Sequence, residues 1–139
     1  MKKDIITPIK NLSKNYVRCG VLGWCIEILF TSLTQGLKKN RTLTGRTSIF
    51  MFPIYGAACL LAPLYPLIKR FSWPVRGIFY MNLIYLTEYL SGRFLMKKNC
   101  CPWDYSSSPL NYKKVIRLDF APYWFATGLL YEKFLQKTP

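Results

Sequence analysis

The sequence predicts an all-α, polytopic membrane protein with four transmembrane helices and a short N-terminal interfacial helix. Hydrophobic residues make up 51% of the chain and aromatic residues 17%, which excludes a disordered or collagen-like chain. The apolar residues gather in runs of about 20, the length that crosses roughly 30 Å of hydrocarbon. The 20 Lys and Arg residues, against 6 Asp and Glu, are bunched between these runs. At 139 residues, the chain is expected to form a single membrane domain.

Four apolar runs are predicted to span the membrane, at about residues 19–37, 48–68, 77–95 and 118–135. The first run contains one charge, Glu27, and the second contains none. The fourth has Asp119 near its start and Glu132 near its end, where we expect Glu132 to be solvated. A soluble helical core is the alternative. It is disfavoured because the second run is apolar nearly all round and the runs are long for buried helices.

Residues 1–16 are predicted to form the interfacial helix, because Ile5, Ile9 and Leu12 fall on one helical face. A frayed basic tail is the open alternative. The basic residues do not orient the chain, since ten lie on each side of the predicted membrane. The first helix usually dominates orientation, so both termini are expected to be cytoplasmic. The surplus positive charge favours membrane lipids with anionic head groups, and nothing organises it along a nucleic-acid groove.

Two acidic residues stand inside predicted spans beside glycines. Glu27 follows Gly23 by one helical turn, and Glu88 precedes Gly92 by one turn. A charge at mid-bilayer costs about 2.5–3.5 kcal/mol, so both carboxylates should face protein. They either line a polar cavity that binds a cation or a polar head group, or pair with other side chains to lock the bundle. Arg93 lies about 140° around the helix from Glu88 and is expected to reach towards the interface.

The second run contains a proline near its start. Pro53 removes an amide donor and is expected to loosen the helix, with Tyr55 close behind it. The freed carbonyl either faces a cavity or marks a plain kink.

The residue inventory argues against an enzyme. There is no histidine and no C-x-x-C among the five cysteines, so no zinc, haem or other cofactor site is expected. The lack of histidine also removes the usual general base. A lipid-modifying enzyme that uses Asp104, Tyr105 or Asp119 is the less favoured alternative.

Residues 97–117 are predicted to form a structured loop at the membrane interface, because loops of this length usually carry structure or function. Trp103 and Tyr105 suit the interface. Asp104 followed by Ser106 favours a turn in which the carboxylate accepts backbone hydrogen bonds.

Several motifs resemble those of the putative ABC-transporter type IV family, the CmpB-like group, and are similar to the proteins named transmembrane protein 229. The matching motifs are Gly23-Trp24-Cys25-Ile26-Glu27, Ile54-Tyr55-Gly56, Glu88-Tyr89 and Cys101-Pro102-Trp103-Asp104-Tyr105-Ser106. The resemblance implies a polytopic membrane protein. The chain lacks the G-x-x-x-x-G-K-[ST] motif, so an ATPase would have to come from another chain.

These observations predict a transporter-type, solute- or lipid-binding membrane component without its own ATPase, either as a homo-oligomer or with a separate ATPase or membrane partner. The alternative is an accessory protein that docks a partner or lipid through the Trp-Asp-Tyr-Ser loop. The candidate ligand-binding or polar-cavity residues are Glu27, Tyr55, Glu88, Arg93, Trp103, Asp104, Tyr105 and Ser106.

Overall fold

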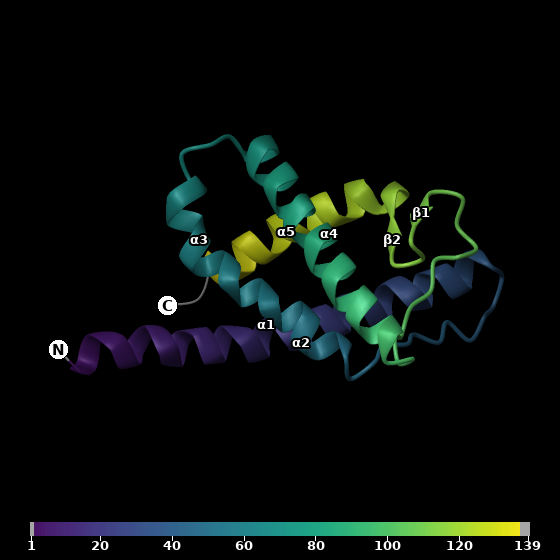
Figure 1. Ribbon diagram of the computed structural model, residues 1–139, viewed down its shortest axis with the longest axis horizontal. Coiled ribbons are helices and arrows are strands. Elements are labelled where there is room, and N and C mark those ends of the chain that lie inside the picture. Colours follow the sequence, from purple (N-terminus) through teal and green to yellow (C-terminus); the bar gives the residue numbers. More distant parts are fainter. Residues whose placement is uncertain (1, 137–139) are drawn as a thin grey trace. The chain divides into compact units, whose positions relative to one another are not determined.

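The computed structural model describes residues 2–136, with side chains from residue 11 onward. The chain is mostly helical (Figure 1), and its elements are α1 (Lys2–Leu37), α2 (Met51–Gly56), η1 (Ala57–Leu60), α3 (Leu61–Ile68), α4 (Trp73–Lys97), β1 (Asn111–Tyr112), β2 (Ile116–Arg117), η2 (Leu118–Phe120) and α5 (Ala121–Gln136). It divides into two compact units, Met1–Leu60 and Leu61–Pro139.

In the first unit, α1 is one continuous helix of 36 residues. The expected interfacial segment and the first expected span therefore belong to the same helix from Lys2 onward, and Met1 lies outside the described residues. The helix ends in a Schellman motif. The amide of Lys39, at φ 61°, donates to the Gly36 carbonyl, and the amide of Asn40 donates to the Gln35 carbonyl, both at 3.0 Å.

Gly20 and Gly23 of α1 face protein, on the side of the helix that carries Glu27. A Cβ atom at Gly20 would lie 2.7 Å from the Phe52 ring, and one at Gly23 would lie 2.1 Å from Tyr55. The missing side chains therefore let α2 approach α1 closely. The Trp24 indole packs on Phe52 and donates to the Ser48 carbonyl at 3.0 Å.

The second apolar run is helical from Met51 to Ile68, but the prediction that Pro53 loosens this helix is wrong. Pro53 is the third residue of α2, where an amide would have no partner within the helix in any case. The helix instead tightens into the 3₁₀ turn η1. That turn stands just before Pro63, which cannot donate to the Cys59 carbonyl.

In the second unit, α4 and α5 cross and pack together (Figure 1). A Cβ atom at Gly77 would lie 2.3 Å from the Phe125 ring, and one at Gly128 would lie 2.4 Å from the Cβ atom of Tyr80. Tyr80 is 1% exposed. Glycines thus set the distance between these helices, as they do in the first unit.

Among the residues that the structure describes, two segments are long and apolar enough to cross a membrane, Asn11–Leu37 and Met51–Ile68. The helix α4 carries four charged residues along its length. With 16 residues, α5 is about 24 Å long, shorter than the hydrocarbon core. The third and fourth expected spans therefore stay predictions.

Candidate functional site

The Trp-Asp-Tyr-Ser loop folds back onto α4 after a second Schellman motif. Asn99, at φ 57°, occupies the left-handed position, and the Cys100 amide donates to the Leu95 carbonyl at 2.9 Å. The Trp103 indole then donates to the Val115 carbonyl at 3.0 Å. Both Trp103 and Val115 pack against Gly92, where a Cβ atom would come within 2.9 Å of either side chain. The missing side chain of Gly92 thus leaves the space in which the loop packs against α4.

The β1–β2 hairpin holds the loop from its other side. Asn111 pairs with Arg117, and Tyr112 pairs with Ile116. The Tyr85 hydroxyl of α4 donates to the Arg117 carbonyl at 2.9 Å. These contacts anchor the hairpin to the helix one turn before Glu88.

The turn of the hairpin is strained. Lys113 and Lys114 both adopt positive φ angles, 50° and 65°, which residues other than glycine and asparagine rarely take. The Lys114 carbonyl accepts a hydrogen bond of 2.9 Å from the Tyr105 amide. The turn also buries Val115 completely. The strained backbone therefore both positions Tyr105 and fills the space over Gly92.

Asp104 and Ser106 form the turn that the sequence predicts. The Asp104 carboxylate accepts a hydrogen bond of 2.9 Å from the Ser106 amide. Hydrogen bonding from the backbone and side chain of Ser106 holds the pKa of Asp104 below its usual value. Both residues are exposed. Their polar groups shape the turn that presents Tyr105 to α4.

Glu88 is the centre of the site. Its side chain lies on α4 with 8% exposure, and its Oε1 atom accepts a hydrogen bond of 3.0 Å from the Tyr105 hydroxyl. The Oε2 atom is buried and makes no hydrogen bond of good geometry. The buried indole of Trp124 on α5, whose nitrogen likewise lacks a well-formed hydrogen bond, interacts with this carboxylate. Phe120 packs edge-on to both Tyr105 and Trp124. One oxygen of the carboxylate therefore lacks a close donor, and aromatic side chains surround the group.

The second predicted carboxylate, Glu27, belongs to the first unit, where Tyr55 interacts with it. Its Oε2 atom is likewise buried without a hydrogen bond. Tyr55 packs against Gly23, one turn before Glu27. A glutamate beside a tyrosine thus occurs in the first unit as well as in the second.

Arg93 does not join the site. It is exposed on α4 whereas Glu88 is buried, as their angular separation predicted. The thiol of Cys101 also offers no reactive group, because burial raises its pKa and keeps it protonated.

The expectation that Glu132 is solvated is wrong. Glu132 is 7% exposed and accepts two hydrogen bonds from Arg76, from Nε at 2.9 Å and from Nη2 at 3.1 Å. The Tyr80 hydroxyl donates to the same carboxylate. The position of Glu132, one turn after Gly128 and beside the buried Tyr131, was the sequence signal for an inward-facing carboxylate.

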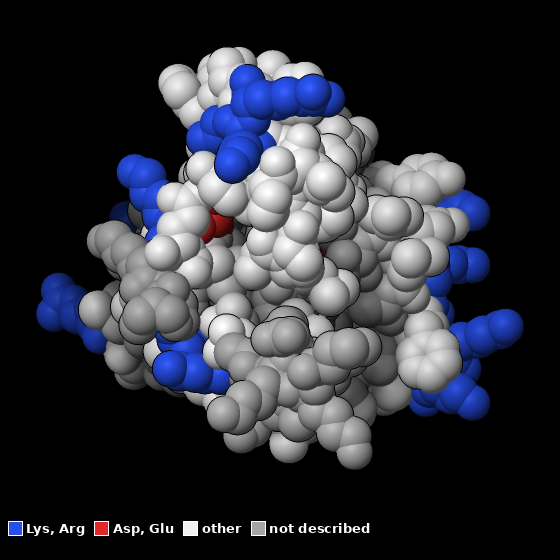
Figure 2. Space-filling model, turned by 90° about the vertical axis from the view of Figure 1, so that its left-hand side faces the viewer, with Lys and Arg blue, Asp and Glu red and all other residues white. Residues whose placement is uncertain are grey.

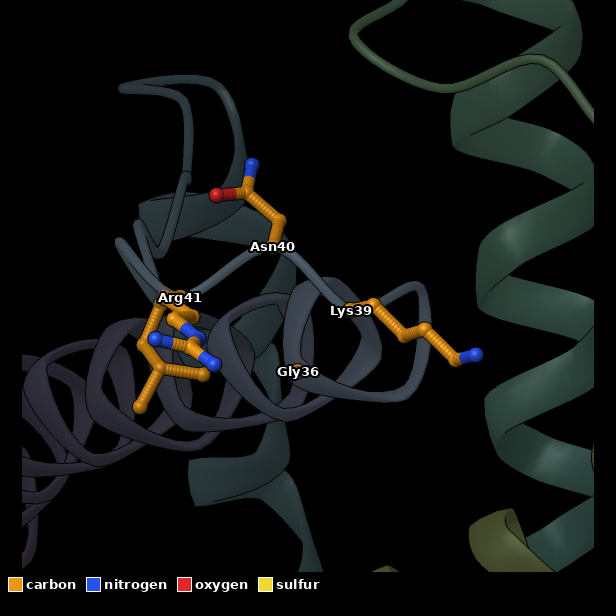
Figure 3. A pocket seen from close by; sticks show the side chains of 5 residues that line it. Gly36, Lys39, Asn40 and Arg41 are labelled. Atoms are coloured by element: carbon orange, nitrogen blue, oxygen red, sulfur yellow. The ribbon is translucent and has the colours of Figure 1, made fainter.

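An open surface depression of about 450 Å³ lies at the end of α1, lined by Gly36, Lys39, Asn40, Arg41 and Leu43 (Figure 3). Lys39, Asn40 and Arg41 point in different directions. Ligand sites need convergent polar groups, so this depression is a weak candidate.

The fold and site together define a mostly helical protein with two candidate membrane spans and a buried carboxylate beneath an anchored loop. Residues 15–138 match the family described as Putative ABC-transporter type IV. The chain belongs to this family, which confirms the resemblance seen in its motifs, and the family name suggests an ABC-transporter-related membrane component. No solved structure matches the chain.

Proposed function

We propose that the chain is a small, non-catalytic integral membrane component of an ABC-type transport system, and that it binds a polar or cationic group at Glu88. This proposal rests on the buried Glu88 carboxylate, in which Oε1 accepts a hydrogen bond from Tyr105 and Oε2 has no well-formed hydrogen bond beside the Trp124 indole. Unpaired buried acceptors are rare in folded proteins and need an explanation. A ligand that donates to Oε2 supplies one.

The exposed surface of α4 supports a membrane setting for this site. Glu88 is buried, whereas several apolar side chains of α4 are 51–61% exposed, namely Ile78, Leu86, Leu90 and Phe94. Apolar residues that face outward and a carboxylate that faces inward are expected of a helix in lipid. The exposed Arg93 lies near the end of α4, where a long basic side chain can reach the interface. We therefore propose that α4, and α5 packed on it, are the third and fourth membrane spans.

The two clearest candidate spans support the same setting. In the most apolar part of Asn11–Leu37 only 17% of the residues are buried, and in that of Met51–Ile68 only 22% are. The core helix of a soluble protein would be mostly buried. With four spans, both termini lie on one side, which we propose to be cytoplasmic.

A separate ATPase is part of this proposal, because the chain carries no phosphate-binding G-x-x-x-x-G-K-[ST] motif. Four short helices also enclose little volume. A transport pathway would therefore form between copies of the chain or with a membrane partner.

The alternative is an accessory protein that docks a partner through the Trp-Asp-Tyr-Ser loop. The contacts of the loop favour the first proposal, since Trp103 and Tyr105 direct their polar atoms to Val115 and Glu88. The Asp104 carboxylate accepts its hydrogen bond from the Ser106 amide within the loop. Little of the loop's polar chemistry remains for a partner.

The test is intact-complex mass spectrometry of the full chain in native nanodiscs. We expect a co-purifying ATPase or a stoichiometric small ligand, and loss of that ligand from Glu88→Gln. Asp119→Asn is the matched control, because it removes one carboxylate charge from an exposed ion pair. Wild-type protein that carries only bulk lipid would contradict the transport proposal, and a ligand retained by Glu88→Gln would place the site elsewhere.

A further inference from the structure

The turn between α3 and α4 combines exposed aromatic and basic side chains. Phe71 is 44% exposed and Trp73 60%, and Lys69 and Arg70 before them are exposed as well. The Phe71 amide donates to the Ile68 carbonyl at 3.0 Å, so the turn follows α3 directly. We call residues 69–73 the α3–α4 turn.

The backbone of the α3–α4 turn is held in place from inside the unit. The Nη1 atom of Arg76 donates to the Phe71 carbonyl at 2.6 Å, while its Nε atom binds Glu132. Trp73 packs edge-on to Phe125 with ring centroids 6.1 Å apart. The exposed side chains thus project from a fixed base.

No carboxylate of residues 11–136 forms an ion pair with the basic residues of the turn. Over residues 11–136 the two ion pairs are Arg76–Glu132 and Arg117–Asp119. Glu132 is therefore already occupied by Arg76, and Lys69 and Arg70 face outward without a carboxylate. The face shown in Figure 2 likewise presents many Lys and Arg side chains and little Asp or Glu.

We propose that the α3–α4 turn is a binding surface for the head group of an anionic phospholipid. Trp73 and Phe71 sit at the boundary between hydrocarbon and head groups, where aromatic side chains concentrate. Lys69 and Arg70 bind the phosphate, and the guanidinium of Arg70 is held 5.4 Å from the centroid of the Phe71 ring. A zwitterionic head group offsets its phosphate with its own cation. An anionic head group does not, so the surface selects it.

This inference rests on the membrane placement in the proposed function, and the test separates the two. The full chain is placed in nanodiscs of phosphatidylcholine that contain an equal mole fraction of acyl-brominated phosphatidylglycerol or acyl-brominated phosphatidylcholine. Bromine quenches nearby tryptophan fluorescence, and the difference between wild type and Trp73→Phe isolates Trp73. We expect stronger quenching of Trp73 by the brominated phosphatidylglycerol.

The charge variants decide the result. Lys69→Gln/Arg70→Gln should lower the preference for phosphatidylglycerol by about five-fold for each cation removed. Lys97→Gln/Lys98→Gln removes the same charge at the other end of α4 and should leave the quenching of Trp73 unchanged. Equal quenching by both lipids, or equal loss in both variants, would overturn the proposal. A Trp73 that neither brominated lipid quenches would instead contradict the membrane placement.

Discussion

Arg76 and Glu132 lie 56 residues apart in the sequence and join α4 to α5 through two parallel hydrogen bonds of 2.9 and 3.1 Å. The side chain of Arg76 is 17% exposed and that of Glu132 7%. Charges taken out of water are stable only with well-oriented partners. This pair, together with Tyr80, therefore fixes where α5 sits along α4.

Glu132→Leu should lower the free energy of unfolding by about 3–5 kcal/mol, because it leaves Arg76 without its carboxylate. The double variant Arg76→Met/Glu132→Leu should recover much of that loss, since no uncompensated charge remains. Reversible unfolding in mixed detergent micelles measures both. Asp119→Asn, in a pair that is about one-third exposed, should cost under about 1 kcal/mol. A Glu132→Leu protein as stable as wild type would contradict the structural role of the pair.

Gly128→Ala should destabilise the second unit by about 1–3 kcal/mol, because the new methyl group would meet the Cβ atom of Tyr80 at 2.4 Å. That atom is fixed to the backbone and cannot move without shifting α4. Gly36→Ala is the control, since there the nearest atom is the flexible end of Leu43. The same unfolding measurement applies, and equal effects in the two variants would argue against a close helix contact at Gly128.

The sequence predicted the helix faces well because glycine spacing and hydrophobic runs are local signals. Gly23 and Gly92 both lie where a partner side chain approaches closely. The Asp104–Ser106 turn was equally local and is confirmed. The distortion within the second apolar run was harder to place, because either Pro53 or Pro63 could cause it. Pro53 does not, since the helix starts only two residues before it.

The site itself needed tertiary information. Tyr105 reaches Glu88 from 17 residues away because the β1–β2 hairpin returns the loop to α4. That hairpin turns at Lys113 and Lys114, a pair without the usual turn signal of asparagine and glycine. The Arg76–Glu132 pair was missed for the same reason, because no local spacing relates two residues on different helices.

Lys114→Gly should stabilise the protein by about 1–2 kcal/mol, because glycine adopts the φ of 65° without the clash that lysine suffers. Lys98→Gly is the matched control. Its φ of −93° is ordinary for lysine, so no gain is expected there. Thermal unfolding of both variants in the same detergent gives the comparison. A gain at both positions would point to the removed charge rather than to relief of backbone strain.

The Asp104 turn should weaken in acid. The pKa of Asp104 is lower in the folded protein than in the unfolded chain, so its contribution is fully present above about pH 4 and is lost as the pH falls through the folded value. Hydrogen exchange of the Ser106 amide should therefore differ between wild type and Asp104→Ala at pH 7 and converge near pH 2. A difference that is independent of pH would mean that the carboxylate charge does not hold the turn.

The contact between Glu88 and Tyr105 should appear as coupling in a double-mutant cycle. Tyr105→Phe removes the donor to Oε1 and leaves the buried carboxylate without its well-formed hydrogen bond, which should cost about 1–3 kcal/mol. In a Glu88→Gln background the same change should cost less, with a coupling energy of about 0.5–3 kcal/mol. Tyr112→Phe is the control, because Tyr112 is 51% exposed at the hairpin, and it should show no coupling to Glu88. Additive losses for Glu88 and Tyr105 would mean that the loop does not close on this carboxylate.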